Sequence, residues 1–125
     1  AEKVKKFLQK HSKVEKVIYS TLHDGEVGER AKKYLKGGYG ALMGIELKGG
    51  LEAGKKFIDS LKMLYHVANI GDARSLAIHP ASTTHSQLNA KDMAAAGVTP
   101  GYVRLSIGIE HADDIIADLD QALNA

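Results

Sequence analysis

The stretch Tyr102–Ile109, with the sequence YVRLSIGI, decides the fold predicted for this chain. An apolar side chain stands at every second position from Val103 onward, which is the period of a strand with one buried face. Arg104, Ser106 and Gly108 occupy the positions between them. We therefore predict a strand that packs against a core on one face and presents Arg104 on the other.

Helical and strand patterns alternate along the rest of the chain. Apolar residues at helical spacing predict helices over residues 2–11, 27–35, 57–65, 90–96 and 113–123. Apolar and β-branched runs predict strands over residues 14–19, 41–47 and 75–78. The nearly continuous apolarity of residues 41–47 predicts burial on both faces, and residues 81–89, rich in Ser, Thr and His, are expected to form a loop.

These elements predict the fold class. The length of 125 residues corresponds to one domain. Because one strand is apolar on a single face, we expect an α/β fold of the two-layer α+β sandwich type. The sheet should be small and mixed or largely antiparallel, with helices on one face.

Composition excludes several classes of protein. A hydrophobic content of 44% argues against disorder, and a net charge of +2 gives no reason to expect a nucleic acid or a membrane surface as partner. The absence of cysteine excludes disulfides and thiolate chemistry, which fits a cytoplasmic protein. No apolar run approaches the roughly 20 residues that a membrane-spanning helix needs.

Arg104 is the most informative candidate for a binding residue. Its neighbours Ser106 and Gly108 leave space over the sheet, so the guanidinium could grip a carboxylate through two parallel hydrogen bonds. The alternative is an exposed strand arginine paired with a surface acid. The pattern alone leaves both open.

Three other patterns suggest chemistry that we do not expect. The six histidines lack the spacing of zinc ligands, so we predict no metal site and expect His79 and His85 to form hydrogen bonds within their loop. A hydrolase could be assembled from Ser82, His85 and Asp72, but no Gly-x-Ser-x-Gly turn is present. The stretch Gly37–Gly40 follows a predicted helix and precedes a strand, the reverse of a dinucleotide-binding loop.

Several segments together resemble a known family. They are His66–Asp72 (HVANIGD), Ser75–Ser86 (SLAIHPASTTHS), Gly97–Val98 and Val103–Glu110 (VRLSIGIE). They closely resemble the C-terminal part of the Cys/Met-metabolism enzymes that depend on pyridoxal 5'-phosphate (PLP). At positions 69 and 83 the chain resembles the O-acetylhomoserine sulfhydrylase branch of this family, because it carries Asn69 and Thr83 where the related lyases usually carry Ser and Met. Glu46–Gly50 and Phe57–Asp59 agree with that branch.

The resemblance covers essentially all of residues 1–125 but only the last third of such an enzyme. It implies a C-terminal small domain whose large, PLP-carrying domain lies outside this chain, in a parent enzyme that forms a homotetramer. It implies that Arg104 and Asn69 bind the α-carboxylate of the substrate, O-acetylhomoserine, and that Thr84 lines the cleft, with Thr83 a weaker candidate. The implied reaction replaces acetate by sulfide or a thiol and yields homocysteine or methionine.

The family's cofactor lysine follows a Ser-x-Thr context that this chain lacks. Lys33 and Lys36, before Gly37–Gly40, imitate only the sequence that follows that lysine. We therefore expect the isolated chain to be inactive. Two alternatives remain open, a free-standing small-molecule-binding module without chemistry and the C-terminal domain of a cystathionine synthase or lyase relative.

Overall fold

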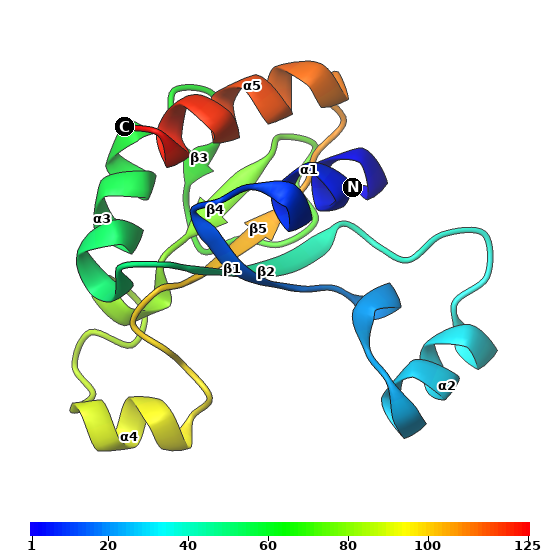
Figure 1. Ribbon diagram of the computed structural model, residues 1–125, viewed down its shortest axis with the longest axis horizontal. Coiled ribbons are helices and arrows are strands. Elements are labelled where there is room, and N and C mark those ends of the chain that lie inside the picture. The colour runs from blue at the N-terminus through cyan, green and yellow to red at the C-terminus, as the bar shows by residue number, and fades with distance from the viewer.

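A five-stranded sheet with three helices packed on one face forms the body of the protein (Figure 1). The computed structural model describes all residues 1–125. Its elements are α1 (Glu2–Lys10), β1 (Val14–Ile18), η1 (Ser20–Leu22), α2 (Gly25–Tyr34), β2 (Leu42–Leu47), α3 (Gly50–Ser60), β3 (Tyr65–His66), β4 (Leu76–Ile78), η2 (Pro80–Ser82), α4 (Ala90–Ala95), β5 (Tyr102–Ser106) and α5 (Ala112–Leu123). No helix is both long and apolar enough to cross a membrane.

The strands lie in the order β1-β2-β5-β4-β3. All neighbours are antiparallel except β3 and β4, which are parallel, so the predicted mixed and largely antiparallel sheet is confirmed. In the central β2–β5 pair, Ile45 lies opposite Val103 and Gly44 lies opposite Arg104. The strand with the clearest sequence pattern, β5, therefore lies in the middle of the sheet.

Helices α1, α3 and α5 cover one face of this sheet and enclose the core. Alternation along β5 sends Val103 and Leu105 into that core, where neither is accessible to solvent. Burying each such side chain contributes about 1.5–3 kcal/mol. The helices supply matching apolar stripes, among them Val4 and Leu8 of α1, Phe57 and Ile58 of α3, and Ile115 and Leu119 of α5.

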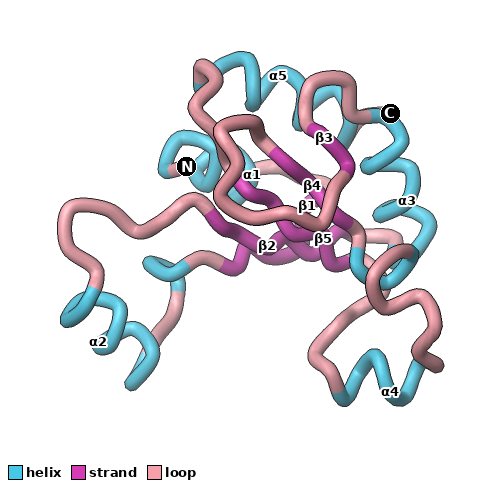
Figure 2. The backbone as a smooth tube through the Cα atoms, turned by 180° about the vertical axis from the view of Figure 1, so that it is seen from behind, coloured by secondary structure: helices cyan, strands magenta, loops and turns pink.

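The remaining helices, α2 and α4, do not cover the core. Seen from behind in Figure 2, they extend from opposite flanks of the sheet. In α2 only Gly28 is buried, and α4 has no buried residue. The predicted layer of helices on one face is thus made by three of the five helices.

The prediction of a helix over residues 57–65 is wrong in its bounds. The helix begins at Gly50 and ends at Ser60, and Tyr65 instead begins strand β3. The cause is Asp118 of α5, whose carboxylate accepts the backbone N–H groups of residues 62, 63 and 64 at 2.8–2.9 Å. These amides cannot continue a helix while they donate to a side chain distant in sequence.

Two details of the strand predictions are also wrong. Strand β5 ends at Ser106, and Ile109 is 86% exposed, because the Gly108 amide leaves the sheet to donate to the Ser75 hydroxyl at 2.8 Å. Strand β2 is not buried on both faces, since Leu42 is 41% exposed. Gly44 is buried, and the ring of Tyr102 lies across it.

Candidate functional site

Arg104 emerges on the sheet face that α1, α3 and α5 leave uncovered. Its neighbours in β5, Val103 and Leu105, point into the core, so strand alternation directs the guanidinium the other way. Its cross-strand partner Gly44 has no side chain, which leaves room for Arg104 and for the ring of Tyr102. A Cβ atom at Gly44 would lie 2.4 Å from that ring. The predicted position of Arg104 is therefore confirmed.

One end of the Arg104 guanidinium is anchored to the loop that contains Asn69. Nη2 of Arg104 donates to the backbone carbonyl of Asn69 at 3.2 Å. The structure thus brings these two residues together across 35 positions, through the carbonyl of Asn69 rather than its side-chain amide. A guanidinium has five N–H donors in a rigid fork, so the remaining donors can bind a carboxylate.

A cleft of about 440 Å³ lies beside Arg104, and we call it the Arg104 cleft. It is mainly apolar, with Arg104 as its charged group, and its lining residues come from β1, β2, β5 and the segment containing α2. Tyr102 contributes its ring. Burial raises the pKa of the Tyr102 hydroxyl, Arg104 opposes this shift, and Glu46 adds to it. The hydroxyl is therefore protonated at neutral pH and can act as a hydrogen-bond donor.

Thr84, the third predicted site residue, does not line the Arg104 cleft. It is exposed, and its hydroxyl lies 2.8 Å from Nδ1 of His85. The weaker candidate Thr83 donates its hydroxyl to the carbonyl of His79 at 2.8 Å, which fixes the loop backbone. Within this chain, then, Arg104 contacts Asn69, whereas Thr83 contacts His79 and Thr84 contacts His85.

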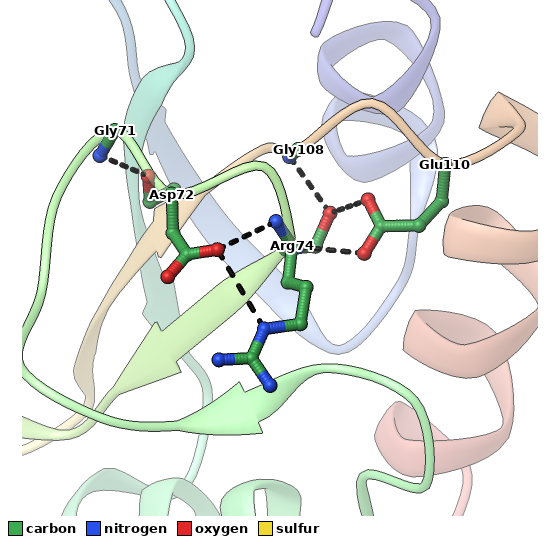
Figure 3. A network of polar contacts seen from close by, with 7 residues as sticks. Gly71, Asp72, Arg74, Gly108 and Glu110 are labelled. Carbon is green, nitrogen blue, oxygen red and sulfur yellow. Dashed lines mark hydrogen bonds and ion pairs between the residues drawn. The ribbon is translucent and has the colours of Figure 1, made fainter.

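The loop that carries Asn69, residues 67–74, is held at several points. The Gly71 amide donates to the Ser106 hydroxyl at 3.3 Å, and the Ile109 amide donates to the Ala73 carbonyl at 2.9 Å. Figure 3 shows Gly71 on this loop and Gly108 on the neighbouring segment that follows β5. Since Arg104 is anchored to Asn69, the same contacts also orient the guanidinium.

The carboxylate of Glu110, for which the sequence predicted no role, completes the support of this loop. Glu110 accepts the amide and the hydroxyl of Ser75, each at 2.7 Å, and the Ser75 hydroxyl accepts the Gly108 amide (Figure 3). Burial raises the pKa of Glu110, but the two hydrogen bonds from Ser75 and one from the backbone of Glu110 itself together lower it by more, so the pKa lies below its usual value. The ionised carboxylate therefore joins the start of β4 to the end of β5.

Asp72 and Arg74 form a second contact at the end of the same loop. The Asp72 carboxylate accepts the Arg74 amide at 2.9 Å and lies 3.6 Å from its Nε, and the hydrogen bond from that amide lowers the pKa of Asp72 (Figure 3). The Arg74 guanidinium stacks over the ring of Tyr65, 4.3 Å from its centre. Asp72 is thus engaged by Arg74, while Ser82 lies against His79, so Ser82, His85 and Asp72 do not assemble a hydrolase triad.

His79 is another residue whose importance the sequence did not reveal. It is completely buried, with Nδ1 at 2.8 Å from the Ser82 hydroxyl and Nε2 at 2.6 Å from the Pro100 carbonyl. Because a carbonyl only accepts, Nε2 carries a proton and donates it to the Pro100 carbonyl. Gly54 of α3 packs directly against this ring, where a Cβ atom would approach to 2.4 Å. The expected hydrogen bonding is confirmed, but the ring belongs to the core.

The Arg104 cleft does not by itself fit PLP, which is held as a Schiff base to a lysine with a partner for its pyridine nitrogen. No lysine, aspartate or glutamate lines the cleft. Lys33 and Lys36 are exposed on the segment around α2, and Nζ of Lys36 donates to the Lys32 carbonyl at 2.9 Å. What the cleft offers is a site for a carboxylate beside apolar groups.

An anchored arginine on the open face of a small α+β fold can hold a carboxylate through charge-assisted hydrogen bonds. The family of Cys/Met metabolism PLP-dependent enzymes matches residues 1–124, and this chain belongs to that family. Its members are PLP-dependent enzymes of the sulfhydrylase and lyase type.

Individual relatives agree with this assignment. The chain is 56% identical over 124 residues to an O-acetyl-L-homoserine sulfhydrylase of Leptospira meyeri, covering 98% of this chain and 28% of that protein. It is 48% identical over 123 residues to an L-methionine gamma-lyase of Fusobacterium nucleatum subsp. polymorphum, covering 98% and 31%.

A solved structure supports the fold. The crystal structure described as a putative O-acetylhomoserine (thiol)-lyase of Campylobacter jejuni, which contains a pyridoxyl-lysine phosphate, superposes with a TM-score of 0.89 at 42% identity. The match covers 100% of this chain and 30% of that chain. The chain thus spans less than a third of the length of each of these three relatives.

Proposed function

We propose that this chain is the C-terminal, substrate-carboxylate-binding domain of a PLP-dependent O-acetylhomoserine sulfhydrylase. The observation that carries the proposal is the Arg104 guanidinium, anchored at one end by Asn69 and open to a largely apolar cleft. The 56% identity to a sulfhydrylase supports the choice of reaction.

In this proposal Arg104 grips the α-carboxylate of O-acetylhomoserine through charge-assisted hydrogen bonds. Asn69 adds a donor from its side-chain amide, and Thr84 approaches the substrate once the rest of the enzyme completes the cleft. The ring of Tyr102 and the apolar lining exclude water from the side chain of the substrate. Holding the carboxylate in one place lowers the barrier by restricting the orientation of the reacting atoms.

The reaction is a γ-replacement, in which acetate leaves and sulfide or a thiol adds to give homocysteine or methionine. PLP, when bound in the parent enzyme, supplies stabilisation of the substrate carbanion. The parent carries its PLP lysine in a larger domain and acts as a cytoplasmic homotetramer. The 125-residue domain binds and orients the substrate, and it is inactive alone.

A second candidate is the equivalent domain of a methionine gamma-lyase, which the 48% identity to the Fusobacterium enzyme supports. Both enzymes would use Arg104 in the same way. Asn69 and Thr83 favour the sulfhydrylase, because the lyases usually carry Ser and Met at these positions. Supplying O-acetylhomoserine with sulfide, or methionine alone, separates the two by the product formed.

Reconstitution tests whether the chain is an enzyme domain or a free-standing binding module. The 125-residue chain is mixed with the remaining part of its parent enzyme, and formation of homocysteine from O-acetylhomoserine and sulfide is followed. We expect turnover only in the mixture. Turnover by the larger part alone, undiminished without this chain, would contradict the proposal.

A further inference from the structure

The segment Ser20–Ala41, which contains η1 and α2 and which we call the α2 arm, extends away from the sheet (Figures 1 and 2). Its base is closed by two hydrogen bonds, from the Tyr19 hydroxyl to the Gly40 carbonyl at 2.7 Å and from the Ser20 hydroxyl to the Tyr39 carbonyl at 2.9 Å. The arm therefore leaves the sheet from a fixed base, and α2 makes its main contacts with η1 of the same arm.

Helix α2 presents an apolar stripe that nothing in this chain fully covers. Val27, Ala31 and Tyr34 stand at positions i, i+4 and i+7 and so share one face, with Val27 52% and Tyr34 69% exposed. Lys32 and Glu29 form an ion pair on the opposite face. A helix of ten residues is marginal alone and depends on packing of its apolar face. The stripe is thus the side on which α2 needs a partner.

The same helix forms a wall of the Arg104 cleft, which Val27 and Ala31 line together with Arg104. Under the proposed function a substrate carboxylate binds Arg104. The α-amino nitrogen of an amino acid lies about 2.5 Å from its carboxylate carbon. The unit that reacts with this amino group must therefore enter the Arg104 cleft, and it then lies against α2.

We propose that the apolar stripe of α2 docks on the PLP-carrying remainder of the parent polypeptide, beside the Arg104 cleft. This inference rests on the proposed function. The occupant is identified by two observations. The chain accounts for only 28% of a relative that it matches over 98% of its own length, and the stripe continues directly into the cleft that the remainder must enter. A second copy of this chain would leave that cleft without its reacting unit.

Hydrogen–deuterium exchange tests this docking without relying on activity. Exchange of the α2 amides, residues 25–34, is measured in the full-length enzyme and in the 125-residue chain. We expect exchange at least about tenfold slower in the full-length enzyme, since docking raises the free energy of local opening. In the full-length enzyme Tyr34→Asp should restore fast exchange, whereas Lys32→Asp, which places the same carboxylate on the opposite face, should not.

Three outcomes would overturn the docking. Equal exchange in the two proteins would mean that the remainder does not contact α2. Protection that grows with the concentration of the 125-residue chain would assign the stripe to a second copy. Equal effects of Tyr34→Asp and Lys32→Asp would mean that the apolar stripe is not the contact. Slow exchange combined with undiminished kcat/KM in an Arg104→Lys enzyme would instead overturn the proposed function and leave the docking in place.

Discussion

The two faces of the sheet differ in what their side chains do. On the covered face Val103, Leu105 and their neighbours are packed under α1, α3 and α5. On the open face a charged group, Arg104, stands beside a glycine and an aromatic ring, flanked by two helices that contribute little to the core. Under the proposed function, adjacent residues of one strand thus serve stability and binding separately, so the two properties can be altered independently.

The largest effect should come from the covered face. Leu105→Ala removes a fully buried side chain, and we expect it to lower the free energy of unfolding by about 2–5 kcal/mol through the cavity left behind. Arg104→Ala, one residue away on the open face, should cost less than about 1 kcal/mol. Urea denaturation of both variants measures the difference. Equal losses would make Arg104 a structural ion-pair partner and remove the division between the faces.

Asp118 extends the comparison to the helix layer, where it holds the amides of residues 62–64. Asp118→Asn places an amide donor against these N–H groups, and we expect a loss of about 1–3 kcal/mol. The control Asp114→Asn changes an exposed carboxylate in the first turn of the same helix and should cost no more than about 0.3–1 kcal/mol. Thermal unfolding compares the two, and equal small losses would show that the Asp118 contacts are unimportant.

The Asp118 carboxylate should also make the stability of the fold depend on pH. Burial raises the pKa of Asp118, but hydrogen bonds from the three backbone amides and Gln121 lower it by more, so it lies below the unfolded value. The contribution of the ionised Asp118 to the free energy of unfolding is therefore complete above about pH 4, which is the pKa of Asp in the unfolded chain. It is lost as the pH falls through the lowered pKa of the folded state. The wild-type chain should lose more stability than Asp118→Asn when acidified from about pH 5 to about pH 2. Parallel losses in both proteins would contradict this assignment.

The smallest effect is expected for the lysines of the α2 arm. Lys33 and Lys36 are exposed and lie outside the Arg104 cleft, so the isolated chain should form no specific imine with PLP. Absorbance of the chain with added PLP should be unchanged by Lys33→Ala or Lys36→Ala. A specific imine band that disappeared in one of these variants would place the cofactor lysine within this chain.

The alternation in Tyr102–Ile109 was sufficient to predict the orientation of Arg104, because strand geometry is local. The end of that strand was not predictable, since it depends on the Gly108 amide reaching Ser75 from another part of the chain. The misplaced helix has the same kind of cause, because Asp118 acts on amides more than 50 positions away. The burial of His79 and the contacts of Glu110 with Ser75 were not predictable for the same reason.

The candidate site, like the fold, could be predicted from the sequence only in part. The resemblance to the family pointed to Arg104 and Asn69, and the fold brings them together. No periodicity in the sequence could have indicated that the contact uses the carbonyl of Asn69, or that Tyr102 covers Gly44. Both depend on how the loop 67–74 and the strands β2 and β5 pack, which is a property of the folded chain.

The central claim, that Arg104 binds the substrate carboxylate, is tested most directly by steady-state kinetics of the full-length enzyme carrying Arg104→Lys. Lysine keeps the charge but loses the fork that can contact Asn69 and a carboxylate together. We predict that kcat/KM for O-acetylhomoserine falls by at least about tenfold, roughly 1.4 kcal/mol of transition-state stabilisation, while Arg74→Lys outside the cleft leaves it nearly unchanged. An Arg104→Lys enzyme with undiminished kcat/KM would contradict the account.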